Sequence, residues 1–542
     1  MKRIFIFILI FFFVKSVTAQ VKLADVLFDN FEYELAAKYY SESDSLNIKQ
    51  QINHALCFYN KNNFHKAIPL FEKAMEKDTN NLFLKFHYGV SLKSVGRYQS
   101  SKRILRKIYE KDSSNLYLKL HLSSLDSLMK WDTIQFFKKL AAFDQLNSKA
   151  SEFSPSFYDD GIFYIIEKGS EEIHKGKRIS LIANNDTISP KEKGTFTNQF
   201  DSVLTYGPAV SPRTYVYKND IEISELFKDY ANPIPKEAID TAKLIISHKG
   251  FNVTSYSTNY DGKKVFYTRH PVNNKWSPET TNNPLMFQGQ HHSKKPKLKK
   301  RRILAIKYLP KTFGSGDVSV TSDGETVYFS SDKRNGFGGT DLYVSHKKIT
   351  GKWSKAKNLG NLINTPFNEE SPRIYDDSVL YFSSNGWPGY GKADIFKCKI
   401  HDDSVFNIQH LPYPVNSSGD DIHFALHPFD ESIGILNSDR SRGQGDEDIY
   451  FAHMIPIGPY VKGYVRLKAD SSIQKNCIVT LFDLENHELK QVTTKVNGIY
   501  RFELKVNQSY KVCATRTGLS GCITVNADDE LFRNEKRDIF LD

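Results

Sequence analysis

Cysteine is scarce in this sequence, and its spacing argues against a metal site. The 542 residues include only Cys57, Cys398, Cys477, Cys513 and Cys522. None of them has the close paired spacing of a zinc site. An odd number of cysteines cannot pair completely within one chain. Cys513 and Cys522 either form a disulfide in an oxidising compartment or are small buried apolar residues, and the sequence favours neither interpretation.

Long hydrophobic runs are missing after the first twenty residues. No later stretch approaches 18 apolar residues, which argues against a membrane-spanning helix there. The chain starts with Lys2 and Arg3, an apolar run over 4–14 and a small-residue pattern at 17–19. These features predict a signal peptide over residues 1–19 and an exported mature protein. An uncleaved anchor is the alternative, and a lipid anchor is not supported because no cysteine follows the cleavage site.

The motifs of common hydrolases are missing as well. The chain has no HExxH or GxSxG segment, and it lacks a recognisable α/β-hydrolase domain. His291-His292 is an isolated pair in a polar segment, for which we expect a solvated loop. We therefore assign no catalytic, cofactor-binding or metal-binding residue, and we expect no enzymatic activity.

The composition that is present indicates a soluble protein with several domains. Hydrophobic residues make up 40% and charged residues 25%, as in ordinary globular proteins, and the length exceeds what one core supports. The net charge is +12, and it falls to +9 when the three basic residues of the signal peptide are removed. A basic exported protein favours anionic partners such as cell-envelope polymers. Nucleic acid is not an expected partner in that compartment.

Residues 21–146 contain few glycines and have a helical rhythm of apolar residues. A 34-residue offset aligns small residues with small ones and large residues with large ones. The aligned pairs are Ala55 and Gly89, Phe64 and Tyr98, Ala67 and Ser101, Phe71 and Leu105, Ala74 and Ile108, Asp78 and Asp112, and Leu82 and Leu116. The pattern resembles tetratricopeptide repeats, which implies a helical solenoid whose concave face holds a partner peptide. A helical cap packed on the following domain is the alternative.

Strand-rich units recur after residue 150, the clearest at a period of 53 or 54 residues. Each has a tight turn, an apolar strand and a polar step, as propeller blades do. The units are Ser322–Val344, Asp376–Lys397, Phe429–Phe451 and, less regular, segments at 153–166, 207–217 and 254–270. The pattern resembles the WD40-like blades of TolB and prolyl-oligopeptidase propellers, which implies roughly six blades over residues 151–456.

Two features of these units invite a functional interpretation. Gly386–Ala393 has the spacing of a phosphate-binding loop, but Ala393 stands where a Ser or Thr must reach magnesium. We interpret this segment as an ordinary blade loop. The acidic pairs Asp332/Asp341 and Asp439/Asp448 could chelate calcium or accept hydrogen bonds from loop amides, and we favour the second interpretation.

A basic run covers Lys294–Arg302, with seven Lys or Arg in nine positions. Such a run usually marks an exposed loop, here flanking the expected strand at Ile303–Ile306. An anionic partner that docks there is the alternative.

A third pattern begins after residue 456. Strands are expected at Val461–Val465, Cys477–Asp483, Gln491–Lys495, Tyr500–Phe502 and Tyr510–Ala514. Their spacing and turn residues resemble the carboxypeptidase-regulatory-like fold, which implies a small prealbumin-like β-sandwich with a structural or binding role.

The expected fold is thus α followed by all-β. We expect a signal peptide at 1–19, helical repeats at 20–150, a propeller at 151–456 and a sandwich at 457–542. This order resembles OmpA-family envelope proteins of type IX secretion and gliding systems in Gram-negative bacteria. The C-terminal OmpA-like domain of that group has no counterpart in the sequence, so peptidoglycan binding by such a domain is not carried over.

The resemblance implies a non-enzymatic periplasmic scaffold associated with the outer membrane. Its partners would be envelope proteins of a secretion or motility complex, peptidoglycan-associated and outer-membrane proteins included. A receptor that binds an envelope glycan or peptide through the propeller is the first alternative. A relative of propeller-type peptidases is the second.

Overall fold

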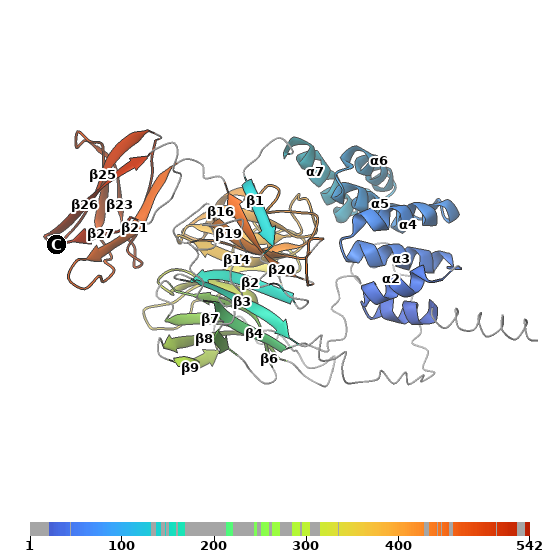
Figure 1. Ribbon diagram of the computed structural model, residues 1–542, viewed down its shortest axis with the longest axis horizontal. Helices are drawn as coiled ribbons and strands as arrows, with labels where there is room; N and C mark the ends of the chain where they lie inside the picture. Colours follow the sequence, from blue (N-terminus) through green and yellow to red (C-terminus); the bar gives the residue numbers. More distant parts are fainter. Residues whose placement is uncertain are drawn as a thin grey trace, which may run out of the picture.

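The computed structural model consists of an N-terminal helical array, a central group of β-sheets and a C-terminal β-module (Figure 1). It describes residues 21–43, 45–131, 137–142, 147, 151–158, 161–168, 213–219, 243–246, 251–259, 263–271, 285–292, 295–303, 315–333, 335–427, 433–441, 443–445, 447–454, 459–505, 507–527 and 537–542. No helix within these ranges is long and apolar enough to cross a membrane. The predicted signal peptide lies outside the described residues.

Helices fill the first part of the described chain. A helical segment at 21–29 precedes α2 (Tyr33–Ser41), α3 (Ile48–Asn60), α4 (Phe64–Lys77), α5 (Leu82–Ser94), α6 (Tyr98–Tyr109) and α7 (Leu116–Trp131). Consecutive helices pack against each other. Their contacts use the small residues that the 34-residue offset aligned: Ala55, Ala67 and Ser101 are buried, and a Cβ on Gly89 would lie only 2.8 Å from Leu105 Cδ2.

The same 34-residue spacing sets where alternate helices begin. Asn47, Asn81 and Asn115 precede α3, α5 and α7, and each side-chain Oδ1 accepts the N–H three residues on, at 3.0, 3.0 and 3.1 Å. Such N-caps satisfy an amide that has no partner within the helix. The helix pairs therefore repeat at 34 residues, as predicted, and the asparagines are a signal of the period that our reading of the sequence missed.

Replacing one of these caps should weaken the array measurably. We expect Asn81→Ala to lower the free energy of unfolding by about 1 kcal/mol, because the Leu84 amide loses its acceptor. Urea denaturation measures the change. Asn80→Ala, at an exposed position beside the cap, is the control. Equal losses in the two variants would contradict the capping role.

Five four-stranded antiparallel sheets follow in the described part of the chain, which we name blades 1 to 5. In order they are β2-β3-β4-β5, β6-β7-β8-β9, β10-β11-β12-β13, β14-β15-β16-β17 and β18-β19-β20-β1. The strands are β1 (Phe137–Ala142), β2 (Ser151–Tyr158), β3 (Gly161–Lys168), β4 (Arg213–Asn219), β5 (Lys243–Ile246), β6 (Phe251–Thr258), β7 (Lys264–Pro271), β8 (Leu285–His292), β9 (Lys295–Ile303), β10 (Ser315–Val320), β11 (Thr326–Ser331), β12 (Asp341–His346), β13 (Lys357–Asn358), β14 (Glu369–Tyr375), β15 (Val379–Ser384), β16 (Asp394–His401), β17 (Ser404–His410), β18 (Asp421–Leu426), β19 (Ile433–Ser438) and β20 (Asp448–Met454).

The first strand of each blade faces the centre, and together these strands close a propeller-type ring. β2 contacts β6, β6 contacts β10, β10 contacts β14, β14 contacts β18, and β18 contacts β2. The expectation of roughly six blades is wrong for the described residues, because two predicted units share one sheet. The segment at 153–166 forms β2 and β3, and the segment at 207–217 ends in β4 of that blade.

The ring is closed by a strand from before the propeller. Residues 137–142, which we expected within the helical region, form β1 and pair antiparallel with β20. The last blade therefore combines three strands from the end of the ring with one from its beginning. Backbone pairing in this sheet therefore fastens the segment before the first blade to the last blade.

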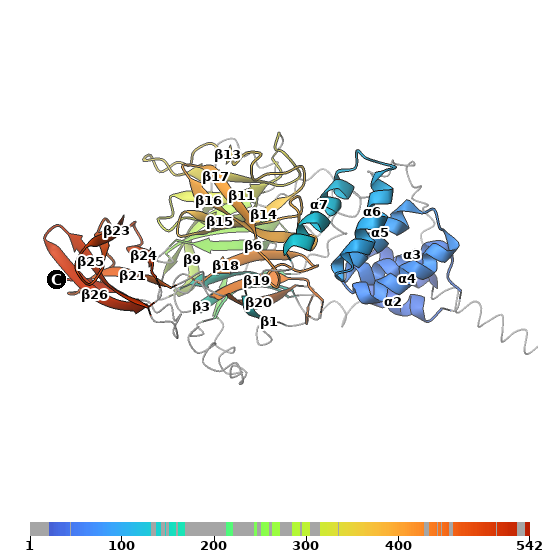
Figure 2. The same cartoon turned by 90° about the horizontal axis from the view of Figure 1, so that it is seen from above.

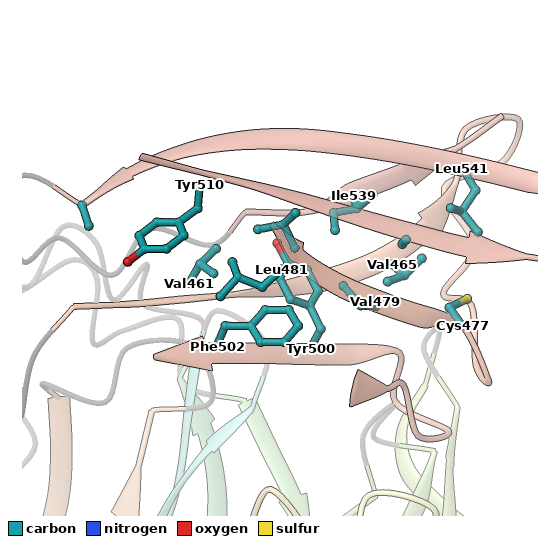
Figure 3. Packing of buried hydrophobic residues seen from close by; sticks show 13 residues of the cluster. Val461, Val465, Cys477, Val479, Leu481, Tyr500, Phe502, Tyr510, Ile539 and Leu541 are labelled. Carbon is teal, nitrogen blue, oxygen red and sulfur yellow. The ribbon is translucent and has the colours of Figure 1, made fainter. Parts of the chain in front are cut away.

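The C-terminal β-module contains two sheets around one apolar core (Figure 3). Its strands are β21 (Tyr460–Leu467), β22 (Ile478–Phe482), β23 (Glu488–Thr493), β24 (Ile499–Glu503), β25 (Gln508–Arg516), β26 (Leu519–Ala527) and β27 (Ile539–Leu541). Val479 and Val512 of one sheet and Val465 and Phe502 of the other are buried in the same cluster. The five strands expected here are all present, and β26 and β27 were not anticipated.

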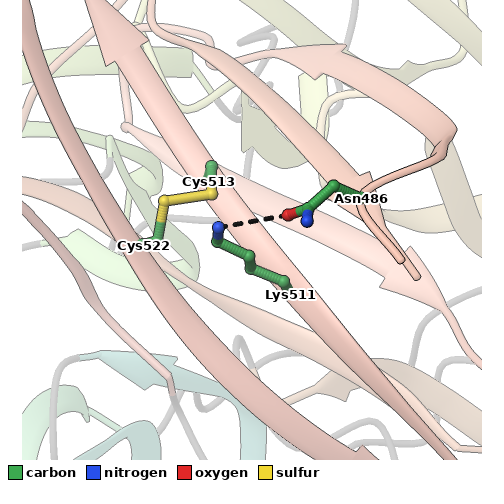
Figure 4. The surroundings of a disulfide bond; sticks show 4 residues. All are labelled: Asn486, Lys511, Cys513 and Cys522. Carbon is green, nitrogen blue, oxygen red and sulfur yellow. Dashed lines mark hydrogen bonds between the residues drawn. A yellow bond between two sulfur atoms is a disulfide. The ribbon is translucent and has the colours of Figure 1, made fainter. Parts of the chain in front are cut away.

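The cysteines divide into one bridge and three buried thiols. Cys513 and Cys522 are directly opposed in β25 and β26 and form a disulfide, which settles the alternative that the sequence left open (Figure 4). Cys57, Cys398 and Cys477 are buried and unbridged. Burial raises the pKa of the Cys57 and Cys398 thiols to about 12, so these cysteines act as small apolar side chains.

Candidate functional site

The repeated aspartates of blades 3 to 5 hold their own loops. Asp341 accepts the amides of Phe337 and Gly338 at 2.7 and 3.1 Å, and Asp394 accepts those of Tyr390 and Gly391 at 2.6 and 2.9 Å. Asp448 does the same in blade 5, with Gln444 and Gly445 as donors. Within the described residues no group of three His, Cys, Asp or Glu side chains could hold a metal ion. The predicted capping role is confirmed for Asp341 and Asp448, and Asp439 accepts the Asp420 amide at 2.6 Å, whereas Asp332 is exposed and its role stays a prediction.

A paired substitution separates capping from calcium binding. We expect Asp341→Ala to lower the free energy of unfolding by about 2 kcal/mol, because two amides and the Asn358 side chain lose a charged acceptor. Asp332→Ala, at an exposed position of the same loop, should change it by less than about 0.5 kcal/mol. EDTA should leave the melting temperature unchanged. Equal losses at both aspartates, together with an EDTA effect, would restore the calcium interpretation.

The segment with phosphate-loop spacing is also occupied internally. Its amides at Tyr390 and Gly391 are bound by Asp394, as described above, and are therefore not available to a phosphate. Lys392 Nζ lies 3.7 Å from Asp420 and 3.4 Å from Asp439. Burial opposes the charge of Lys392, but these two carboxylates outweigh it and raise the pKa of the ammonium group. The segment is a blade loop, as predicted.

The helical array docks on this loop of blade 4. The Gly389 amide donates to Ser124 Oγ of α7 at 3.2 Å, and the Gly389 carbonyl accepts from Lys93 Nζ of α5 at 3.2 Å. The N–H and the C=O of one loop residue are thus bound by two alternate helices, α7 and α5. A side chain at residue 389 would collide with Asp394, so the close approach requires glycine. Two helices of the array, α5 and α7, thus contact the propeller loop.

Further contacts extend this joint across the array. Asn62, between α3 and α4, donates to the Asp439 carbonyl at 2.9 Å. Tyr117 of α7 packs edge-on against Phe367, with ring centroids 4.6 Å apart. Lys93 is buried, and this desolvation lowers its pKa to about 8 despite the nearby Asp394. The alternative of a helical cap packed on the next domain is therefore the better description of the array.

The opposite end of blade 4 contacts the C-terminal β-module. Lys462 of β21 is 1% exposed, and its Nζ donates to Tyr375 Oη and to Asp376 at 2.8 Å each. The same ammonium lies 4.5 Å from the centre of the Tyr375 ring. Tyr375 ends β14 and Asp376 follows it, whereas Gly389 lies beyond the far end of β15. Blade 4 therefore contacts both neighbouring modules, which lie on opposite sides of the ring in two views (Figures 1 and 2).

Arg373 occupies the centre of the ring. Its Nη1 donates to the Tyr256 and Val318 carbonyls at 3.2 and 3.3 Å, and its Nη2 donates to Ser154 Oγ at 2.7 Å. The guanidinium of β14 thus joins the inner strands of blades 1, 2 and 3. Burial lowers the pKa of Arg373 to about 10, although Asp317 opposes the shift. An arginine so placed fills the middle of the ring.

A polar chain crosses the inner strands beside Arg373. Ser371 Oγ donates to Asp317 at 2.7 Å, and His423 Nε2 lies 3.0 Å from the same carboxylate. Asn437 donates to Glu447, which leaves its Oδ1 to accept from His423 Nδ1 at 2.8 Å. Burial disfavours the charged form of Asp317, but His423, Ser371 and Arg373 outweigh it and lower the pKa.

The order of this chain argues against a serine nucleophile. In a hydrolase triad the histidine accepts the serine proton, and a carboxylate orients the histidine. Here the aspartate lies between serine and histidine, so the proton of Ser371 points to Asp317. Ser371 and His423 both have positive φ, at 52° and 53°, next to bulges in β14 and β18. The bulges bring these side chains together, which no motif in the sequence indicated.

The basic run forms a strand, not a loop. Residues Lys295–Ile303 are β9, the outermost strand of blade 2, and His291-His292 ends β8 instead of lying in a loop. The loop expectations for both segments are wrong, because a lysine-rich segment is compatible with an edge strand that pairs on one side only.

Comparisons with known proteins show no family. No family model and no curated protein matches the chain. A crystal structure of TolB from Acinetobacter baumannii is 14% identical, covers 57% of this chain and 56% of its own, and has a TM-score of 0.28. Prolyl oligopeptidase B from Galerina marginata is 12% identical, covers 71% of this chain and 56% of its own, and has a TM-score of 0.27. An α-L-arabinofuranosidase from Lactobacillus brevis is 8% identical, covers 57% of this chain and 91% of its own, and has a TM-score of 0.34. The chain thus spans just over half the length of the first two, and at these TM-scores the likenesses carry no argument about activity.

Proposed function

We propose that the protein is a non-enzymatic scaffold that holds other proteins of a cell-envelope complex. The observation that carries this proposal is blade 4, whose two ends bind the helical array and the C-terminal β-module through buried polar contacts. Three modules joined in this way present their outer surfaces in a constant arrangement. Such an arrangement suits assembly of partners better than turnover of a substrate.

The residues at the centre of the ring support the same proposal. Arg373 donates to β10, the strand that carries Asp317, and His423 lies beside Asp317. Ser371 donates to Asp317, whose pKa is lowered, and not to a histidine. A peptidase needs a nucleophile beside a general base. A receptor that binds a ligand in the channel needs space where the Arg373 guanidinium lies. Both alternatives therefore receive less support than the scaffold.

We place the scaffold in the periplasm, associated with the outer membrane. The predicted signal peptide and the disulfide of the C-terminal β-module both suit an oxidising compartment outside the cytoplasm. The partners would be proteins of a secretion or motility complex, as the module order implies. Because Lys93, Ser124 and Tyr117 already contact blade 4, these partners would bind other parts of the helices or the rim of the ring.

Site-specific photo-crosslinking in the producing cells tests this function. A photoreactive residue at Lys73 of α4 or at Arg103 of α6, both exposed on the array, should capture envelope proteins that mass spectrometry identifies. The same residue at Asn486, exposed on the C-terminal β-module, reports whether that module contributes. Capture of no envelope protein at any position, together with turnover of a peptide or glycan by the purified protein, would overturn the proposal.

A further inference from the structure

The strands of blade 2 have an unbalanced charge. β7 contributes Lys264 and Arg269, and β9 contributes six Lys or Arg in nine residues. None of the four strands contains Asp or Glu. The inner and middle strands of blade 4, by contrast, contain Glu369, Glu370 and Asp394. Blade 2 is therefore where much of the +12 net charge of the chain is concentrated.

Most of this charge lies at the rim of the ring. β9 pairs with β8 and is the last strand of its sheet in the described chain. Figure 1 shows it at the outer edge of blade 2, away from the helices. β5, the outer strand of the adjacent blade, contacts β9 and has the sequence KLII, which adds no acidic residue. The backbone thus places six basic positions along about 30 Å of one edge, without a carboxylate in the adjoining strands.

The form of the strand indicates which anionic partner fits. Pro296 and two register irregularities interrupt pairing between β8 and β9. Proline, lysine and bulges on an edge all oppose addition of another strand, so an acidic peptide that extends the sheet is not favoured. Residues 299–302 are four consecutive basic positions, and alternation along a strand cannot place all of them on one face. A flat bilayer would meet only part of them, whereas a flexible linear polymer can follow all of them.

We propose that the rim formed by β9 binds a linear acidic polysaccharide. The repeated carboxylates of such a polymer meet the repeated cations of the strand, and neither partner needs to change its backbone. Charges can protect an edge from aggregation, but six basic positions without a carboxylate in the adjoining strands also create a strongly cationic surface. This surface is separate from the proposed scaffold contacts and adds a glycan to the partners of the protein.

Binding to polygalacturonate, measured by biolayer interferometry with the full mature chain, tests the proposal. We expect binding that weakens at least roughly tenfold between 50 and 300 mM NaCl, because salt screens exposed charges. The variant K295Q/K297Q/K299Q/K300Q should bind at least roughly tenfold more weakly. The corresponding four-fold Lys→Arg variant, which keeps the charge, should bind like the parent.

A matched control has the same net charge but an intact rim. K66Q/K73Q/K77Q/K107Q removes four exposed lysines of the helical array and should change binding less than about twofold. Urea midpoints that agree among the variants show that they fold alike. Equal weakening by both Gln variants would mean that net charge alone acts, and would overturn the proposal. So would rim-dependent binding to poly-L-glutamate or to phosphatidylglycerol vesicles that equals or exceeds binding to the polysaccharide.

Discussion

Arg373→Met should lower the free energy of unfolding by about 3–5 kcal/mol. The guanidinium donates to two backbone carbonyls and one hydroxyl on three inner strands, and the variant leaves these buried acceptors without their donor. Each buried unsatisfied group costs about 1–3 kcal/mol. The loss of a buried cation near Asp317 adds to this cost, because Arg373 helps to keep that carboxyl ionised. Chemical denaturation followed by tryptophan fluorescence measures the change.

Two further variants show whether this effect comes from the geometry of Arg373. Arg103→Met replaces an exposed arginine of α6 by the same residue and should change stability by less than about 0.5 kcal/mol. Arg373→Lys keeps the charge but loses the planar fork, so it should lie closer to the Met variant than to the parent. An Arg373→Met protein as stable as the Arg103→Met protein would show that the ring does not depend on this arginine.

The joint between helices and propeller should strengthen as pH rises from about 8 to about 10.5. Burial lowers the pKa of Lys93 to about 8 in the folded protein, whereas an unfolded lysine titrates at the model value of 10.5. Between these values the unfolded chain binds the extra proton, so the free energy of unfolding increases with pH. The whole increment is about 3 kcal/mol at 1.36 kcal/mol for each pKa unit. Amide hydrogen exchange of α5 and α7, measured across this range, reports it.

Lys93→Met isolates this contribution from other groups that titrate in alkali. The variant keeps an unbranched side chain but has no titratable group, so the pH-dependent increase in protection of α5 and α7 should disappear. Lys102→Met, on a side chain of α6 that pairs with Asp126 away from the joint, is the control and should retain the increase. An unchanged pH profile in Lys93→Met would mean that Lys93 is not buried as described.

Local patterns account for much of the agreement between sequence and structure. The 34-residue offset predicts the helix pairs because each pair needs small residues where its helices approach, as at Ala55 and Gly89. The Asp-Gly turn at Asp323-Gly324 is present, with Gly324 at a φ of 70°. The blade aspartates are capping residues because their partners lie three or four positions away. Interactions between residues a few positions apart can therefore be predicted from the sequence.

Contacts between distant segments account for the disagreements. Nothing near residues 137–142 indicates that they pair with β20, more than 300 positions later, and the long insertion between β3 and β4 made one blade resemble two. Arg373 and His423 lie in ordinary strand sequences. Their partners come from other blades, so only closure of the ring makes them neighbours.

By itself, the sequence determined most of the element types, the repeat periods and the capping role of Asp341 and Asp448, because propensity and hydrogen bonding within a few residues suffice for these. Tertiary structure alone decided that five blades close the ring in the described part of the chain, that Arg373 fills its centre and that the helices bind Gly389 of blade 4. These features depend on burial, which joins groups hundreds of residues apart and makes each unpaired polar atom costly. Burial of such polar groups also accounts for the contact of α5 and α7 with blade 4, which the sequence did not indicate.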